Sequence, residues 1–315
     1  MGAGAATVRA PDQAAESAET NRSRQGSAHF ADSAARRRSR LRSYLHLIRP
    51  GNAVMAAAGG ATGLILAGGS TQLGLVLAAT LPPLLLSGFG NVVNDLRDLE
   101  LDRSAHPTRP LPAGRVRRAE AWALAGLLLV TGLAWTQAGG FPAFAFAGFN
   151  ALLLGVYEAR LKMTGLPGNV LVALLVGSTF LYGGVVATGR LPEAPMLLLL
   201  AGMATLTNLA REVLKDVEDL DGDRGHRHTF PMRFGPGPAR LLALALVNVA
   251  LIASVLAFLR SPVDWWTPWL IILALADAVF LIGACWAWVD VGTAQRLLKL
   301  AMLIALAAFL SGALD

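Results

Sequence analysis

Residues 73–93 read LGLVLAATLPPLLLSGFGNVV, and residues 94–102, which follow directly, read NDLRDLELD. The first stretch has no charged residue and is long enough to cross a bilayer, which takes about 20 apolar residues in a helix. The second stretch carries four acids. Together they predict a transmembrane helix that ends in a cluster of carboxylates at the membrane surface.

The composition supports the same interpretation for the rest of the chain. Of its 315 residues, 54% are hydrophobic and 15% are charged, whereas soluble proteins carry about 25% charged residues. Residues 41–315 are therefore expected to form one all-α, polytopic membrane bundle of about nine helices with two related halves. The apolar runs lie near 45–67, 72–95, 119–137, 141–157, 168–188, 194–215, 239–258, 266–289 and 297–313.

The basic residues are distributed as in a membrane protein. Residues 1–40 have no sustained apolar period and are expected to form a disordered basic tail. The predicted loops at 96–118 and 211–240 carry six Lys and Arg each, and the loops on the other side carry at most one. Because cytoplasmic loops are enriched in these residues, we expect a multi-pass protein of the cell inner membrane with its basic loops in the cytoplasm. The net charge of +6 then needs no nucleic-acid partner.

Two acidic clusters share one spacing, three and then four residues apart. Their members are Asp95, Asp98 and Asp102, and Asp216, Asp219 and Asp223. This spacing places three side chains on one face of a helix. A shift of 121 residues superposes the two clusters. The repeat predicts that the two acidic sites face each other at one end of the bundle.

Carboxylates at a membrane boundary cost desolvation energy unless they are paired or bind a metal. Mg²⁺ commonly binds through one or two carboxylates together with phosphate oxygens. Basic side chains, which bind phosphate oxygens, crowd the same predicted end: Arg103, Arg109, Arg115, Arg160, Lys162, Arg211, Lys215 and Arg224. The sequence thus predicts a magnesium site for a diphosphate whose hydrocarbon tail lies between helices.

Two other interpretations stay open. The carboxylates could form the pathway of a cation-coupled transporter, although transporter acids usually lie near the bilayer midplane. They could also be solvated loop residues of a structural membrane protein, which leaves the 121-residue match unexplained. The single cysteine, Cys285, excludes a Cys-based zinc site.

The motifs resemble those of the UbiA superfamily of membrane prenyltransferases. Residues 94–102 are similar to its first aspartate-rich motif, NDxxDxxxD, and residues 219–223, DLDGD, to its second. Residues 109–115, RPLPAGR, are similar to the basic loop after the first motif. The stretches IRPGN at 48–52 and REVLKDVED at 211–219 look most like the digeranylgeranylglyceryl phosphate synthase branch.

The resemblance implies Mg²⁺-dependent transfer of a prenyl group from its diphosphate to a lipid-like acceptor. For that branch the donor is geranylgeranyl diphosphate, and the acceptor is the hydroxyl of geranylgeranylglyceryl phosphate. The implied metal ligands are Asn94, Asp95, Asp98, Asp102, Asp216, Asp219 and Asp223. The implied diphosphate contacts are Arg103, Arg109, Lys162 and Lys215, and the implied catalytic residues are Asp95, Asp98, Asp219, Asp223 and Lys162.

Asn52 and Tyr157 are candidates for the acceptor pocket, and a helix–helix hydrogen bond is the competing interpretation for each. Superfamily members with aromatic acceptors often carry YAxxD before the second motif, where residues 215–218 of this chain read KDVE. An aromatic acceptor, such as a quinone precursor, is therefore the alternative. Lys215 would suit an anionic glycerophosphate head.

Overall fold

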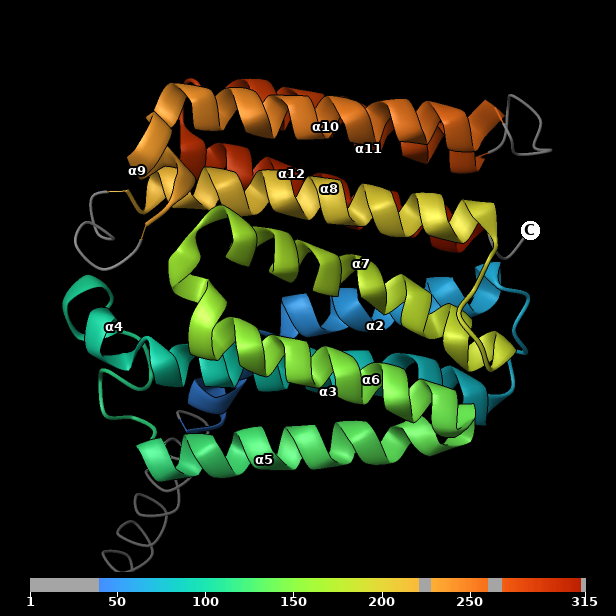
Figure 1. Ribbon diagram of the computed structural model, residues 1–315, viewed down its shortest axis with the longest axis horizontal. Helices are drawn as coiled ribbons and strands as arrows, with labels where there is room; N and C mark the ends of the chain where they lie inside the picture. Colours follow the sequence, from blue (N-terminus) through green and yellow to red (C-terminus); the bar gives the residue numbers. More distant parts are fainter. Residues whose placement is uncertain (1–39, 221–227, 260–267, 313–315) are drawn as a thin grey trace, which may run out of the picture.

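The computed structural model describes residues 40–220, 228–259 and 268–312. Every regular element within these ranges is helical, which confirms the predicted all-α class. The long helices run side by side as a bundle (Figure 1). The predicted tail at 1–40 lies almost wholly outside the described residues.

Nine helices of at least 17 residues lie in these ranges, close to the predicted segments. They are α2 (Pro50–Leu66), α3 (Leu73–Arg97), α5 (Arg118–Ala134), α6 (Gly140–Val156), α7 (Leu166–Thr188), α8 (Pro195–Glu218), α10 (Pro236–Leu259), α11 (Pro268–Trp286) and α12 (Val291–Gly312). Seven continuous stretches are long and apolar enough to cross a membrane, and the segment from Arg118 to Thr164 counts as one of them.

The remaining elements are short. They are α4 (Leu99–Ala105), α9 (Phe230–Phe234), the 3₁₀-helices η1 (Trp135–Gly139) and η3 (Lys162–Thr164), and the π-helix η2 (Tyr157–Leu161). Residues 40–48 are helical as well, and Arg49 separates them from α2. The segment between the predicted runs 141–157 and 168–188 is mostly helical, because α6 continues through η2 and η3.

Prolines and glycines determine where several helices begin and how closely they pack. Pro50, Pro167 and Pro195 occupy the first turns of α2, α7 and α8, where the missing N–H removes no intrahelical hydrogen bond. Helix α2 packs against both α3 and α7. A Cβ on Gly60 would overlap the carbonyl oxygen of Ala79 in α3, and one on Gly183 of α7 would overlap the carbonyl oxygen of Gly60. Small residues thus let three backbones approach one another, as is common between membrane helices.

The backbone repeats the 121-residue match. Helix α3 is capped by Asp98, with φ −82° and ψ 1°, and α8 is capped by Asp219, with φ −84° and ψ 3°. Each cap N–H donates to the carbonyl oxygen four residues earlier. The short helices α4 and α9, which follow these two helices, lie at the same end of the bundle (Figure 1). The predicted placement of both acidic motifs at one end therefore agrees with the fold.

We expect Gly60→Ala to lower the free energy of unfolding by about 1–3 kcal/mol, because the added methyl group has no space beside α3. The matched control is Gly126→Ala in α5, where an added Cβ meets no atom within 4 Å. That change should leave stability equal or raise it by up to about 1 kcal/mol through helix propensity. Thermal unfolding in detergent measures both, and equal midpoints for the two variants would contradict this account of the packing.

Candidate active site

The three carboxylates of the first motif are each paired with a cation of the chain. Asp95 is 2% exposed and forms an ion pair with Arg49. Lys162 Nζ lies 2.8 Å from Asp98 Oδ1. Asp102 is 3% exposed, and Arg109 Nη1 donates to both of its oxygens at 2.7 Å. Chain cations therefore offset part of the desolvation cost of these three aspartates.

A second set of contacts joins the end of α3 to η2. Asn94 Nδ2 donates to Glu158 Oε1 at 3.1 Å, and Lys162 Nζ donates to Glu158 Oε2 at 3.1 Å. The π-turn of η2 carries Glu158, which is 8% exposed. Such turns occur mostly as single-turn bulges, frequently at functional sites. Lys162 is held between Asp98 and Glu158 with a side chain only 6% exposed.

The second motif is arranged differently. Asp216, which is 8% exposed, accepts a 2.7 Å hydrogen bond from Asn169 Nδ2 of α7. Asp219 lines a cavity between the helices of the bundle. Asp223 lies outside the described residues.

The expectation that each acidic set lies on one uninterrupted helical face is wrong in detail. Helix α3 ends at Arg97, and α4 begins at Leu99, so Asp98 sits at a junction. Helix α8 likewise ends at Glu218, before Asp219. The backbone hydrogen bonds continue across the first junction, from the Asp102 N–H to the Asp98 carbonyl. The side chains therefore stay near one another although the helix is broken.

A cavity of about 570 Å³ leads from these motifs into the bundle. Its charged end includes Arg49, Arg109, Lys215 and Asp219, and the rest of its lining is mostly apolar, with the carboxylate of Asp277 from α11 among it. The apolar lining includes Leu154, Phe180, Leu200, Met203, Leu306 and Phe309. From Leu200 to Asp219 the lining covers about 28 Å of α8, at about 1.5 Å per residue.

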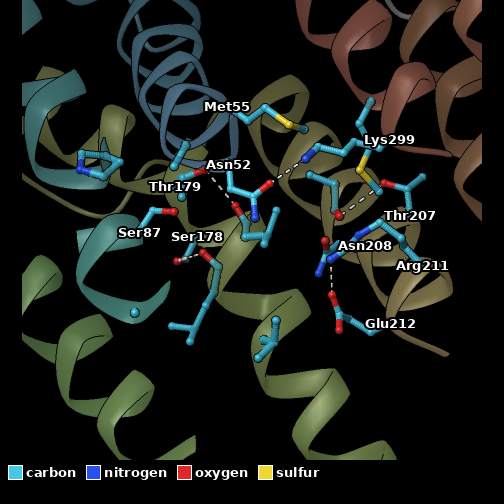
Figure 2. A pocket seen from close by; sticks show the side chains of 18 of the residues that line it. Asn52, Met55, Ser87, Ser178, Thr179, Thr207, Asn208, Arg211, Glu212 and Lys299 are labelled. Atoms are coloured by element: carbon cyan, nitrogen blue, oxygen red, sulfur yellow. Dashed lines mark hydrogen bonds and ion pairs between the residues drawn. The ribbon is translucent and has the colours of Figure 1, made fainter. Parts of the chain in front are cut away.

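The two residues predicted for the acceptor pocket both line this cavity. Asn52 Oδ1 accepts a 2.8 Å hydrogen bond from Lys299 Nζ of α12 (Figure 2). Asn52 therefore both lines the cavity and forms the helix–helix hydrogen bond that was the competing interpretation.

Arg103 differs from the other predicted bases in its exposure. Its side chain is 61% exposed and pairs with Glu100 at 2.7 Å. Arg109 and Lys215 line the cavity, whereas Arg103 and Lys162 do not.

Several charged residues of the site had no predicted role. They are Arg49, Glu158, Glu212, Glu218, Asp277 and Lys299. The signal for two of them was present in the sequence, since Glu212 and Asp277 interrupt predicted apolar runs, where charged residues are expensive. Lys299 lies near the start of the run predicted at 297–313, and only the packing of α12 brings it beside Asn52.

The oxygen donors suit a hard divalent cation such as Mg²⁺. Carboxylates from both motifs and the amide of Asn94 belong to the ligand types that Mg²⁺ prefers. Within the described ranges, no three His, Cys, Asp or Glu residues lie close enough to hold a metal. An ion bound here would therefore take one or two carboxylates and complete its shell with substrate oxygens and water, as Mg²⁺ commonly does.

Comparison with known proteins agrees with this site. The UbiA prenyltransferase family matches residues 53–311. The digeranylgeranylglyceryl phosphate synthase of Methanopyrus kandleri is 39% identical over 281 residues, which cover 87% of this chain and 100% of that protein. A solved structure concerned with digeranylgeranylglyceryl phosphate synthase in membranes is 31% identical, with a TM-score of 0.67, and the match covers 87% of this chain and 98% of that one.

A UbiA homologue from Archaeoglobus fulgidus, solved with GPP and Mg²⁺, shares the fold at 19% identity and a TM-score of 0.61. That match covers 85% of this chain and 99% of the homologue. The family match spans both acidic motifs and the helices that line the cavity, which excludes the transporter and purely structural interpretations. The chain therefore belongs to the UbiA prenyltransferase family and is an integral, multi-pass membrane prenyltransferase.

Proposed function

We propose that the protein transfers a geranylgeranyl group from geranylgeranyl diphosphate to the hydroxyl of geranylgeranylglyceryl phosphate, forming an ether bond. The observation that carries this proposal is the cavity, in which a charged mouth beside both acidic motifs opens into a long apolar interior. Such a shape suits a substrate with an anionic head and an isoprenoid tail. Relatives named digeranylgeranylglyceryl phosphate synthase, which match nearly over their full length, support the choice of acceptor.

The chain would bind the diphosphate between its two motifs. Mg²⁺ would be held by Asn94, Asp95 and Asp98 of the first motif and by Asp219 and Asp223 of the second. Asp102, through Arg109, and Asp216, through Asn169, would support these ligands. Bound Mg²⁺ would polarise the phosphate oxygens and make the diphosphate a better leaving group. Arg109, Lys162 and Lys215 would neutralise further charge on the departing diphosphate.

The apolar lining would exclude water from the carbon that loses the diphosphate. That exclusion would let the acceptor hydroxyl, rather than water, form the new carbon–oxygen bond. Asn52 and Tyr157 line the same cavity and would orient the acceptor. An aromatic acceptor is the second candidate, because the cavity lining also includes aromatic side chains such as Phe146 and Phe180.

We also propose that the motif-bearing end of the bundle faces the cytoplasm of a cell whose inner membrane holds the protein. The support is the charge distribution, with six Lys and Arg in each of 96–118 and 211–240. Residues 1–40 would then form a basic cytoplasmic tail ahead of the transmembrane domain.

Replacing either Asp95 or Asp219 with Asn should lower the rate of prenyl transfer by about 100-fold or more. That is the loss of rate typical when one preorganised charge-stabilising group is removed from an active site. The matched control is Glu100→Gln, because Glu100 belongs to the first motif but is 73% exposed and pairs with Arg103. It should retain full activity. Product formation in detergent, followed by mass spectrometry, measures all three variants. Full activity in Asp95→Asn would refute the metal assignment.

Removing divalent cations with EDTA should stop the reaction, and added Mg²⁺ should restore it, because oxygen donors from the chain and the diphosphate would share the ion. The measurement is ether product per unit time at increasing free Mg²⁺. Turnover that continues in excess chelator would rule out a magnesium-dependent mechanism.

In a panel of acceptors with geranylgeranyl diphosphate as donor, geranylgeranylglyceryl phosphate should give the highest kcat/KM. Basic side chains at the cavity mouth, including Arg211, Lys215 and Lys299, favour an anionic head. Mass spectrometry of the products identifies the acceptor used. Preference for an aromatic acid would favour the second candidate function.

A further inference from the structure

One side of the cavity mouth presents hydrogen-bond donors that no proposed diphosphate contact uses. Asn208 and Arg211 of α8 and Lys299 of α12 line the cavity there (Figure 2). Asn208 and Arg211 are three residues apart, so they share one face of α8. Helix α12 packs against both α8 and α2, which brings Lys299 to the same part of the cavity.

Asn208 has a donor that none of the described residues satisfies. The residue is 5% exposed, and its Nδ2 atom has no hydrogen-bond partner among the described residues. A buried donor without a partner is costly and uncommon in native proteins. Because Asn208 lines the cavity, a bound ligand with an acceptor oxygen would satisfy this donor.

Lys299 carries a charge that the neighbouring residues do not neutralise. Its Nζ donates to the neutral Asn52 Oδ1 at 2.8 Å, and it makes no ion pair within the described part of the chain. Arg49 and Arg211 are close enough to repel it. Glu212 interacts with Arg211, Lys215 and Arg49, and Arg49 also forms an ion pair with Asp95. Two carboxylates therefore interact with three other cations, and a bound anion would neutralise the charge of Lys299.

We propose that Asn208, Arg211 and Lys299 bind the phosphate of the glycerophosphate acceptor and thereby select it over an uncharged acceptor. An amide N–H, a guanidinium and an ammonium are all donors, and phosphate oxygens accept from all three. The diphosphate of the donor substrate is the other phosphate that could fit. The residues proposed to hold a metal-bound diphosphate lie at helix ends: Asn94, Asp95 and Asp98 at the end of α3, and Asp219 at the end of α8. Asp219 is eight residues beyond Arg211, which is about 12 Å along a helix.

This inference rests on the proposed function, and it is tested by the choice between two acceptors. Geranylgeranylglyceryl phosphate and geranylgeranylglycerol differ only in the phosphate. Lys299→Met should reduce the preference for the phosphorylated acceptor, as the ratio of kcat/KM values, by about 10- to 100-fold, the effect of one hydrogen bond to a charged group. Its KM for geranylgeranyl diphosphate should stay unchanged, and Lys299→Arg should restore most of the preference.

The matched control is Arg296→Met, also in α12. Arg296 is 76% exposed, is absent from the cavity lining and contacts Thr293 and Asp290. This variant removes the same charge from the same helix and should keep the wild-type preference.

Asn208→Leu provides a second test that does not depend on charge. Because the replaced donor has no partner, the thermal midpoint in detergent should stay equal or rise. The preference for the phosphorylated acceptor should still fall. A purely structural role for Asn208 predicts the opposite pattern, a lower midpoint and an unchanged preference.

The outcomes separate the two proposals. If the wild-type protein forms no ether product from either acceptor, the proposed function is wrong before any variant is compared. If it forms product and Lys299→Met keeps its preference, only the present inference is wrong. A rise in the KM for geranylgeranyl diphosphate in Lys299→Met, with the acceptor preference unchanged, assigns these donors to the other substrate and overturns the inference.

Discussion

The fold depends on compensating negative charge at the end of apolar helices. Asp95 and Asp102 are almost fully buried, and each is paired with an arginine, Arg49 or Arg109. Removing one member of such a pair leaves an uncompensated buried charge, which typically costs about 3–5 kcal/mol. The pairs therefore hold the carboxylates in place: one connects α3 to the residue before α2, and the other connects α4 to the loop that follows it.

The two halves of the bundle share the conformation of their helix ends. Asp98 and Asp219, which cap α3 and α8, agree closely in φ and ψ. Among the contacts of the repeated aspartates, Asp95 forms an ion pair with Arg49, and its counterpart Asp216 accepts a hydrogen bond from Asn169. The repeat therefore extends to the backbone at both helix ends, while these particular contacts belong to one copy each.

Much of this architecture could be predicted from the sequence, because apolar length and charge placement are local signals. The run at 73–93 lies within α3, and the acidic motif begins at the end of that helix as expected. The sequence alone could not reveal which cation pairs with which acid. Arg49 and Asp95 are 46 residues apart, and Lys299 and Asn52 are 247 apart. Such pairs depend on how whole helices pack. The π-turn at Glu158 was also missed, because α6 gives no periodic signal of its end.

Arg49 has φ 53° and ψ 70°, and it is the only non-glycine residue with positive φ among those described. That left-handed conformation costs an L-residue about 1–2 kcal/mol, and glycine would adopt it freely. Glycine, however, has no guanidinium with which to neutralise Asp95. At the residue before α2 the chain therefore keeps a strained backbone conformation together with the guanidinium that neutralises Asp95. Replacing Arg49 with glycine would relieve the strain but would be expected to impair the site beside it.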